Sequence, residues 1–337
     1  MSSPRARAEA CANIALAKYW GKSSLGGNLT AVPSLSLTLD ALRTRTEVTF
    51  DAGFAHDEIE LNGRVVEDAG KERVTRLLDR LRLQANEVRH ARVVSSNNFP
   101  TAAGLASSAS GFAALAVAGA HALGLNLTAG QLSAEARRGS ASAARSLFSG
   151  FAELGKEADE ARSVAPLDHW DVAMVVAVIE AGPKPIASTG GMIHTALTSP
   201  YYGAWLETAP ALFEEMKAGV LDRDFERVAV GMEHSTRLMH ATMFTSLPPV
   251  LYLRGTTVEL MHEVAARRAQ GIPEAYTMDA GPNVKVLTTR EHAERTREFL
   301  ASVSGVSRVL VCHPGPAASL LSLDGDLGSA LASTETP

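Results

Sequence analysis

The chain has few cysteines and no strong excess of either charge. Only Cys11 and Cys312 are present among its 337 residues, which excludes a disulfide framework and a zinc site built from several thiolates. Because the formal net charge is −5, the surface offers no general attraction for nucleic acid, and we expect no nucleic-acid partner. An anionic ligand must therefore be bound by local lysines and arginines.

Long uncharged hydrophobic runs are also absent. Arg5, Arg7, Glu9 and Lys18 interrupt the first twenty residues, so we expect no secretory signal peptide. No later segment is long enough without charge to span a bilayer, and we expect no membrane partner. The composition is that of a soluble enzyme, and the two cysteines fit a reducing compartment. We therefore expect a cytoplasmic protein.

The hydrophobic pattern predicts an α+β protein with two domains. Regular alternation of strand and helix is missing, which argues against a doubly wound sheet. A Gly-Pro-Lys-Pro segment breaks the chain at 182–185, so we predict domains over 1–184 and 185–330 and a flexible tail over 331–337. Strands are predicted at 35–39, 46–50, 58–61, 92–95, 171–179, 275–279, 284–288 and 309–312, and helices at 107–123, from 128, and at 201–218, 225–241 and 250–270.

The most informative segment is a small-residue loop, residues 95–106, that leads into an alanine-rich helix. Gly104 and the alanines beside it allow backbone N–H groups to approach an anion, and the first turn of the helix adds unpaired N–H groups. The hydroxyls of Ser107 and Ser108 can reach phosphate oxygens or a bound Mg²⁺. The alternative is a tight loop before a helix whose small residues pack closely against a sheet.

Residues 12–22 contain two lysines close together. In an extended conformation Lys18, Trp20 and Lys22 share one face and Tyr19 points away. The two lysines could then converge on one multiply charged anion. The alternative is a surface strand whose lysines extend their charged ends into water.

A second candidate anion-binding segment lies after Gly139, which separates two predicted helices. Ser140 and Ser142 then fall at a helix N-terminus, where hydroxyls and free amides bind anions. Arg145 follows Ser142 by three residues and shares its helix face, and its planar guanidinium suits a carboxylate or a phosphate. The alternative is a helix cap followed by a solvated arginine.

Two more segments place polar residues beside turns. Asp279 ends an apolar strand just before a Gly-Pro-Asn turn, where a rigid backbone can hold a general base, although turn formation also favours aspartate there. Ser188 and Thr189 precede a predicted helix and could bind an anion, or could form an ordinary cap. No serine-hydrolase elbow or zinc motif is present, so we interpret His240 as a packing or hydrogen-bonding residue of a helix.

Taken in order, these segments resemble the diphosphomevalonate decarboxylase family of the GHMP kinase superfamily. The resemblance rests on residues 13–22, 97–109, 139–146, 188–192 and 277–283, and spans 13 to about 320. It implies a GHMP-kinase-type fold, with an N-terminal ATP-binding α/β domain that has a left-handed βαβ crossover. It also implies a ferredoxin-like C-terminal domain and a homodimer.

The resemblance implies an ATP- and Mg²⁺-dependent reaction on mevalonate 5-diphosphate. The 3-hydroxyl is phosphorylated, phosphate leaves, and loss of CO₂ gives isopentenyl diphosphate. Asp279 would orient or deprotonate the hydroxyl, and Arg145, with Asn13 nearby, would hold the substrate carboxylate. Lys18 would contact Asp279 or the phosphates.

The same resemblance implies two sets of binding residues. Substrate would be bound by Tyr19, Lys22, Ser140, Ser142, Arg145, Ser188 and Thr189, and ATP by Asn98, Pro100, Ala103, Gly104, Leu105, Ala106, Ser107 and Ser108. The metal ligands stay open, with Ser108 as a candidate.

The chain also departs from the family pattern. Ala141 and Ala144 replace a glycine and a cysteine, and Thr189 stands where many bacterial members carry an arginine that contacts the diphosphate. The number of substrate phosphates is therefore open. The alternatives are a mevalonate 5-phosphate decarboxylase that forms isopentenyl phosphate, a mevalonate 3-kinase, and a non-catalytic ligand-binding member.

Overall fold

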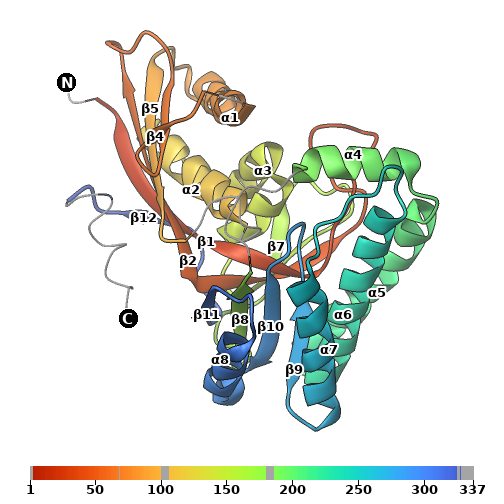
Figure 1. Cartoon of the computed structure of the whole chain (residues 1–337). Coiled ribbons are helices and arrows are strands. Elements are labelled where there is room, and N and C mark those ends of the chain that lie inside the picture. Colours follow the sequence, from red (N-terminus) through yellow and green to blue (C-terminus); the bar gives the residue numbers. More distant parts are fainter. Residues whose placement is uncertain (1–2, 68, 100–105, 180–185, 325–326, 328–337) are drawn as a thin grey trace.

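The computed structural model describes residues 3–67, 69–99, 106–179, 186–324 and 327, and contains two β-sheets (Figure 1). The first sheet has the strand order β12-β1-β2-β5-β3-β4, and β6 joins it through β2 and carries β7 at its other edge. Its strands are β1 (Arg5–Ala17), β2 (Ser34–Asp51), β3 (Glu58–Leu61), β4 (Arg64–Val65), β5 (His90–Asn97), β6 (Phe151–Leu154), β7 (Ala161–Ala165) and β12 (Ser319–Leu321).

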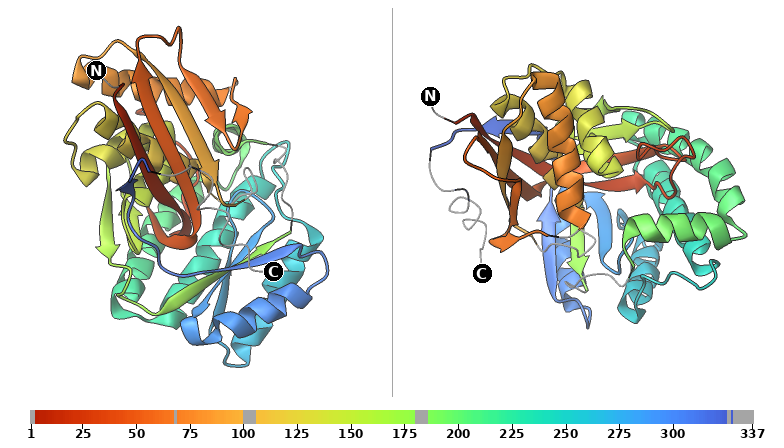
Figure 2. Two further views of the ribbon diagram at one scale, coloured as in Figure 1. Left: turned by 90° about the vertical axis from the view of Figure 1, so that its left-hand side faces the viewer. Right: turned by 90° about the horizontal axis from the view of Figure 1, so that it is seen from above.

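Helices cover one face of this sheet, as Figure 2 shows. They are α1 (Ala69–Ala85), α2 (Ser107–Ala122), α3 (Ala129–Gly139) and a 3₁₀ helix, η1 (Ala141–Leu147). The alanine-rich α2 packs against β1 and β2 because its small side chains allow close approach. The parallel strands β3 and β5 have α1 between them in the chain, which is the expected βαβ crossover. Its left-handedness stays a prediction.

The second sheet is antiparallel and has the order β11-β8-β10-β9. Its strands are β8 (Val172–Val178), β9 (Glu274–Thr277), β10 (Val284–Thr289) and β11 (Arg308–Cys312). The helices of this half are α4 (Ser188–Thr198), α5 (Tyr202–Asp222), α6 (Phe225–Phe244), α7 (Gly255–Ala269), α8 (Ala293–Ser302) and the short 3₁₀ helix η2 (Arg290–His292). In chain order the strands run fourth, first, third, second across the sheet, as in a ferredoxin-like fold, so the α+β prediction is confirmed.

One strand of the second sheet precedes the domain boundary that we predicted. We placed 171–179 in the first domain, but β8 pairs with β10 and β11 of the second sheet. Its uninterrupted hydrophobic sequence predicted a buried strand correctly and carried no information about its partners. The chain-breaking segment used for the boundary, 182–185, lies outside the described residues.

The two halves share one hydrophobic core. Leu16 and Leu37 of the first sheet, Val176 of the second, and Met216 and Met232 of α5 and α6 belong to a single buried cluster. The C-terminal end of β1 contacts α6. Residues that follow β1 are therefore held between the two halves.

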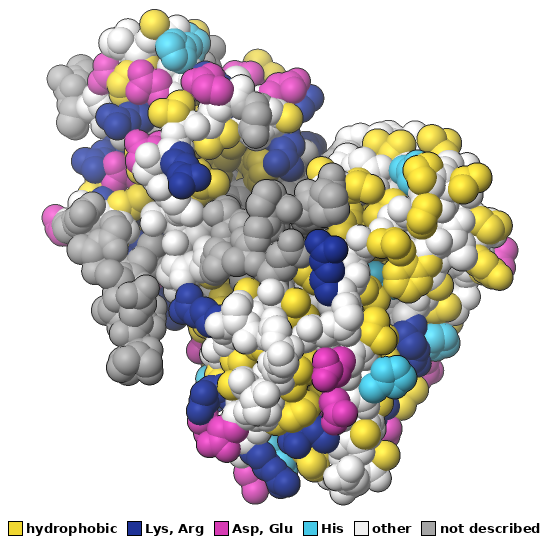
Figure 3. All heavy atoms as spheres, viewed as in Figure 1, with side chains coloured by type: hydrophobic (Ala, Val, Ile, Leu, Met, Phe, Trp, Pro, Cys, Tyr) yellow, Lys and Arg dark blue, Asp and Glu magenta, His cyan; other side chains and the backbone are white. Residues whose placement is uncertain are grey.

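No helix in the described part of the chain is long and apolar enough to cross a membrane. Exposed hydrophobic side chains gather over the α4 side of the molecule (Figure 3). They include Ile193, Leu197, Tyr201, Leu247 and Leu251. The homodimer stays a prediction.

Candidate active site

A cleft of about 1090 Å³ lies between the two halves of the molecule. Most of the predicted site residues line it: Asn13, Lys18, Tyr19, Lys22, Ala106, Ser107, Ser108, Ser140, Ser142, Arg145, Ser188, Thr189 and Asp279. The fold thus brings together residues as far apart in the chain as Asn13 and Asp279.

Lys18 and Asp279 meet at the floor of the cleft. Lys18 follows β1, where its backbone N–H donates to Ser235 Oγ at 3.0 Å. Its ammonium Nζ lies 2.6 Å from Asp279 Oδ1, and its side chain is only 1% exposed. Burial lowers the pKa of Lys18 to about 8, although the negative charge of Asp279 opposes that change. Lys18 was predicted to contact either Asp279 or the phosphates, and the structure contains its contact with Asp279.

Asp279 follows β9 and has 27% of its side chain exposed. Burial by itself would raise the pKa of Asp279, but the ammonium groups of Lys18 and Lys285 outweigh this effect. They hold that pKa well below the ordinary range of aspartate. Asp279 therefore presents an ionised carboxylate to the cleft.

Arg145 is buried on η1 and is held by neutral partners. Its Nε donates to Ser36 Oγ at 2.9 Å, and its Nη2 donates to Asn13 Oδ1 at 3.2 Å. No carboxylate among the described residues forms an ion pair with it. Burial lowers the pKa of Arg145 to about 10. A buried cation without a paired carboxylate is costly, so Arg145 is suited to an anion that enters the cleft.

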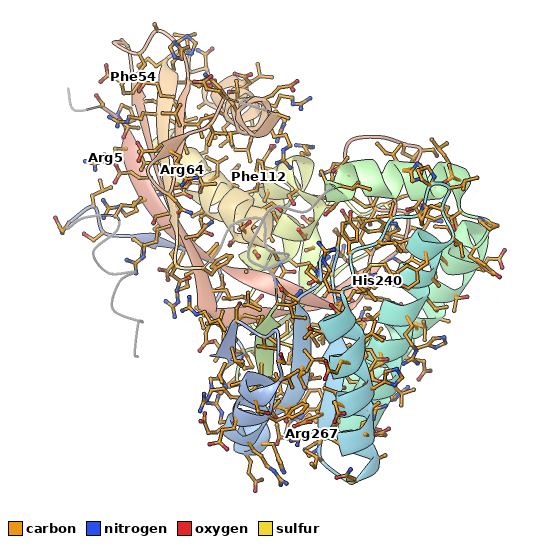
Figure 4. The ribbon with its side chains drawn as sticks, in the orientation of Figure 1. Arg5, Phe54, Arg64, Phe112, His240 and Arg267 are labelled. Atoms are coloured by element: carbon orange, nitrogen blue, oxygen red, sulfur yellow. The ribbon has the colours of Figure 1, made fainter. Side chains whose placement is uncertain are left out.

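Hydroxyl groups form a row between two helix N-termini. Ser108 Oγ is 3.4 Å from Ser140 Oγ, which is 3.2 Å from Ser142 Oγ. Neither α2 nor η1 has a side-chain cap at its N-terminus, so their first N–H groups remain suited to an anion. Gly139 permits this arrangement, because an added Cβ would lie 2.2 Å from Cδ1 of Phe112 on α2 (Figure 4).

The prediction that Tyr19 points away from the lysines is wrong. Tyr19 Oη lies 3.0 Å from Lys22 Nζ, and the lysine also contacts Asn28 Oδ1. Strand β1 ends at Ala17, so the alternation of an extended strand does not continue. Trp20 instead packs in a hydrophobic cluster against Tyr252, with ring centroids 6.4 Å apart.

Asn98 is the one described residue of the predicted ATP set that does not line the cleft. Its Oδ1 accepts from the backbone N–H of Arg43 at 2.8 Å, and its Nδ2 donates to the carbonyl of Ala41 at 2.9 Å. These bonds hold the chain near β2, and the contact of Asn98 with ATP stays a prediction. Pro100, Ala103, Gly104 and Leu105 lie outside the described residues.

Sequence reasoning missed several basic residues of the cleft. Arg73, Arg76 and Arg80 line it from α1, which we did not predict. Their spacing of three and four residues could have revealed one basic helix face. Lys285, which does not line the cleft but lies 3.2 Å from Asp279 Oδ2, was also missed. A lysine within the otherwise hydrophobic start of β10, Val-Lys-Val-Leu, was the available signal.

His240 gives the protein an acid-sensitive position. It is fully buried on α6 (Figure 4), and burial together with the nearby charge of Lys18 lowers its pKa from 6.5 to about 4. The unfolded chain therefore takes up a proton before the folded chain does. The stability that His240 contributes is complete above about pH 6.5 and is lost as the pH falls towards 4.

Because of His240, we expect the free energy of unfolding to be about 3 kcal/mol lower at pH 4 than at pH 7. Urea unfolding at both pH values should show the loss in the wild-type protein, and a smaller loss in His240→Gln. The exposed His121 provides a control, because His121→Gln should leave the difference unchanged. Equal losses in the wild-type protein and His240→Gln would contradict this assignment.

Comparison with known proteins places the chain in a family. Residues 10–165 match the model of the diphosphomevalonate decarboxylase-like N-terminal domain. Residues 174–313 match that of the mevalonate 5-diphosphate decarboxylase C-terminal domain. The chain belongs to the diphosphomevalonate decarboxylase family. The first match ends at residue 165 and the second begins at residue 174, so most of β8 falls within the second.

Individual members of the diphosphomevalonate decarboxylase family match most of this chain. The Candida albicans enzyme is 36% identical over 90% of this chain and 94% of its own length. The Rattus norvegicus enzyme is 38% identical over 86% of this chain and 77% of its own. A solved Enterococcus faecalis mevalonate diphosphate decarboxylase is 40% identical, with a TM-score of 0.87 over 94% of this chain and 98% of its own. The Staphylococcus aureus structure is 36% identical, with the same TM-score and coverage.

The alanines that depart from the family pattern are buried. Ala141 and Ala144 pack in a hydrophobic cluster with Leu154 and Ala161. Ala141 is only 2% exposed, although it also borders the cleft. Its methyl group is therefore accommodated mainly by neighbouring apolar side chains.

Proposed function

We propose that the chain catalyses the ATP-dependent decarboxylation of mevalonate 5-diphosphate to isopentenyl diphosphate, with release of ADP, phosphate and CO₂. The observation that carries this proposal is the pairing of an ionised Asp279 with the buried Arg145 in one cleft. A simple kinase needs no cation aligned with a substrate carboxylate. A related solved structure, 41% identical, is described as a complex with MVAPP, AMPPCP and magnesium.

Asp279 would act on the tertiary 3-hydroxyl. Because its pKa is held so low, it is a weak general base and is better suited to orient the hydroxyl and accept its proton late. ATP with Mg²⁺ supplies the phosphoryl group and neutralises charge in a largely dissociative transfer. When phosphate departs, the Asp279 carboxylate would stabilise the positive charge that develops at the tertiary carbon.

Arg145 would hold the substrate carboxylate so that the bond to be broken is aligned with the developing cation. Its contacts with Ser36 and Asn13 fix the guanidinium before substrate enters. Asn13 is itself fixed, because its Nδ2 donates to Ser146 Oγ at 2.8 Å. The carboxylate-binding site is thus formed in advance.

The remaining residues form two sets, one for the substrate diphosphate and one for ATP. Tyr19, Lys22, Ser140, Ser142, Ser188 and Thr189 would bind the substrate diphosphate, and the N-terminus of α2 with Ala106, Ser107 and Ser108 would bind ATP. Mg²⁺ in such sites uses phosphate oxygens and one or two protein ligands. The Ser108 hydroxyl, which lies at the cleft beside Ser140, would be suited to that position.

We also infer a cytoplasmic location, since both cysteines are free and buried. The homodimer implied by the family resemblance stays a proposal. Sedimentation of the purified protein over a range of concentrations tests it. A mass of one chain at every concentration would reject it.

The decisive experiment is mass spectrometry of the products. The pure protein is incubated with ATP and Mg²⁺ and, in separate tubes, with mevalonate, its 5-phosphate or its 5-diphosphate. Isopentenyl diphosphate from the diphosphate alone supports the proposal. Isopentenyl phosphate from the monophosphate favours the alternative raised by Thr189, a 3-phosphorylated product without carbon loss indicates a kinase, and no product indicates a binding protein.

A further inference from the structure

The carboxylate of Asp279 is held on both of its oxygens by lysines. Oδ1 is 2.6 Å from Lys18 Nζ, and Oδ2 is 3.2 Å from Lys285 Nζ. The two lysines come from different halves of the molecule, since Lys18 follows β1 and Lys285 lies on β10. The carboxylate is therefore bridged between the first half and the second sheet.

Lys285 occupies a position that otherwise suits a hydrophobic residue. It lies opposite Val176 of β8 and Thr277 of β9 in the middle of the second sheet. Leu287, two residues further along β10 and on the same face, belongs to the core shared by the two halves. The Lys285 side chain is 0% exposed. A buried ammonium at such a place destabilises the fold unless it is paired with an opposite charge.

We propose that Lys285 is a positioning residue for the reaction, which fixes the Oδ2 side of the Asp279 carboxylate so that its orientation is set before substrate binds. This inference rests on the proposed function of the same site. With Lys18 alone the carboxylate could rotate about its last side-chain bond. A second contact at the other oxygen removes that freedom, and misplacement of a catalytic group by about 1 Å costs on the order of 10²-fold in rate.

Several other titratable groups lie around Asp279 and its two lysines. His240 on α6 is neutral at working pH, because burial lowers its pKa to about 4. Arg145 on η1 and Tyr19 after β1 also face this region. Lys285 itself adds to the lowering of the pKa of Lys18, since two ammonium groups at one carboxylate repel each other. Removal of Lys285 therefore changes the titration of both Asp279 and Lys18.

The signs of these changes are the same. Without Lys285 the Asp279 carboxylate loses a stabilising cation, so its pKa rises. Lys18 loses a repelling neighbour, so its pKa also rises. If turnover needs a protonated Lys18, the alkaline limb of the pH profile of kcat moves to higher pH. A purely structural role for Lys285 would lower the amount of folded enzyme and leave the alkaline limb where it is.

The test is the Lys285→Met variant, with the wild-type product assay done first. We expect kcat to fall about 10²-fold, KM values for ATP and mevalonate 5-diphosphate to stay within about 2-fold, and the alkaline limb of the pH profile to move upward. Lys285→Arg keeps the charge and should recover much of kcat with the alkaline limb unshifted. Lys217→Met is the matched control, because Lys217 pairs with Glu153 at 2.6 Å outside the cleft.

The outcomes separate the two proposals. A wild-type protein that forms no isopentenyl diphosphate rejects the proposed function. An active wild-type protein whose Lys285→Met variant keeps kcat within about 2-fold, or loses it with the alkaline limb unshifted, rejects the role of Lys285. If Lys285→Met does not fold, Lys285→Arg decides, since a folded arginine variant with a shifted alkaline limb or with no recovered activity also contradicts the proposal.

Discussion

Asp279→Asn is expected to reduce kcat by about 10²- to 10⁴-fold, which is the range that a positioned acid–base group contributes. Asparagine keeps the shape of the side chain and cannot accept a proton from the 3-hydroxyl. It also removes the negative charge that would stabilise the developing cation. Binding of ATP should be kept, because the α2 N-terminus and the hydroxyls of Ser107 and Ser108 are unchanged.

The same substitution leaves Lys18 and Lys285 without their shared carboxylate, so the fold of the variant must be checked. Thermal unfolding and binding of a non-hydrolysable ATP analogue provide that check. The control is Asp171→Asn, since Asp171 is an exposed aspartate that pairs with Arg290 outside the cleft. A folded Asp279→Asn protein with more than a tenth of wild-type kcat would remove the carboxylate from the mechanism.

The fold was predictable where one local pattern decides an element. The helix predicted from 128 is α3, and Thr128 and Gln131 form a capping box at its start with both hydrogen bonds present. The alanine-rich helix after the phosphate-binding candidate was placed within one residue of α2, Ser107–Ala122. Helix α1 was missed because it is highly charged and buries mainly Leu77, Leu78 and Leu81. Its helical character depends on packing, which a weakly apolar pattern does not reveal.

The sequence also predicted two short strands where the structure has one, β2, Ser34–Asp51. The alternation is interrupted near residue 40, and the partner strand β1 has a register irregularity between Cys11 and Asn13 at that point. A bulge keeps the strand continuous while it shifts the side-chain pattern. Sheet partners are a further limit, since nothing local in β8 specified the second sheet.

The sequence predicted most of the residues that line the cleft, but not the contacts that hold them in place. Motif order indicated Arg145 and Asp279, but only the fold shows that Ser36 holds the first and Lys285 the second. Tyr19 was misplaced because its neighbours were assumed to continue a strand. Asn98 was assigned to ATP by the family resemblance, which gave no hint that its amide also bonds to the backbone near β2. Long-range contacts of this kind leave no local pattern.

Arg145→Lys should separate the two steps of the reaction. An ammonium cannot make the two-pronged contact with a carboxylate, and it also leaves the hydroxyls and amide that hold the guanidinium poorly paired. Loss of charged hydrogen bonds worth about 1.5–3 kcal/mol corresponds to about 10- to 100-fold in the decarboxylation step. Phosphoryl transfer depends on Asp279 and the ATP-binding helix end, so ADP formation should fall less than CO₂ release.

The loss of CO₂ release in Arg145→Lys should also become larger as the pH rises. Burial lowers the pKa of Arg145 from 12.5 to about 10. A lysine starts with an ordinary pKa about 2 lower, so the same burial would leave it partly neutral near pH 8. The ratio of CO₂ to ADP, measured at pH 6.5 and pH 8, should therefore be lower at the higher pH in the variant and constant in the wild-type protein. Because this ratio cancels effects on the shared phosphoryl transfer, the titration of Lys18 does not obscure it.

The matched control for this experiment is Arg137→Lys. Arg137 is as little exposed as Arg145, but its guanidinium donates to backbone carbonyls of Gly27 and Asp159 at 2.7 Å each and pairs with the Asp159 carboxylate at 3.1 Å. Its replacement should lower stability and leave the ratio of CO₂ to ADP at the wild-type value. If Arg145→Lys keeps that ratio at both pH values, then Arg145 does not hold the substrate carboxylate, and its buried charge serves only to organise Asn13 and the strand beneath it.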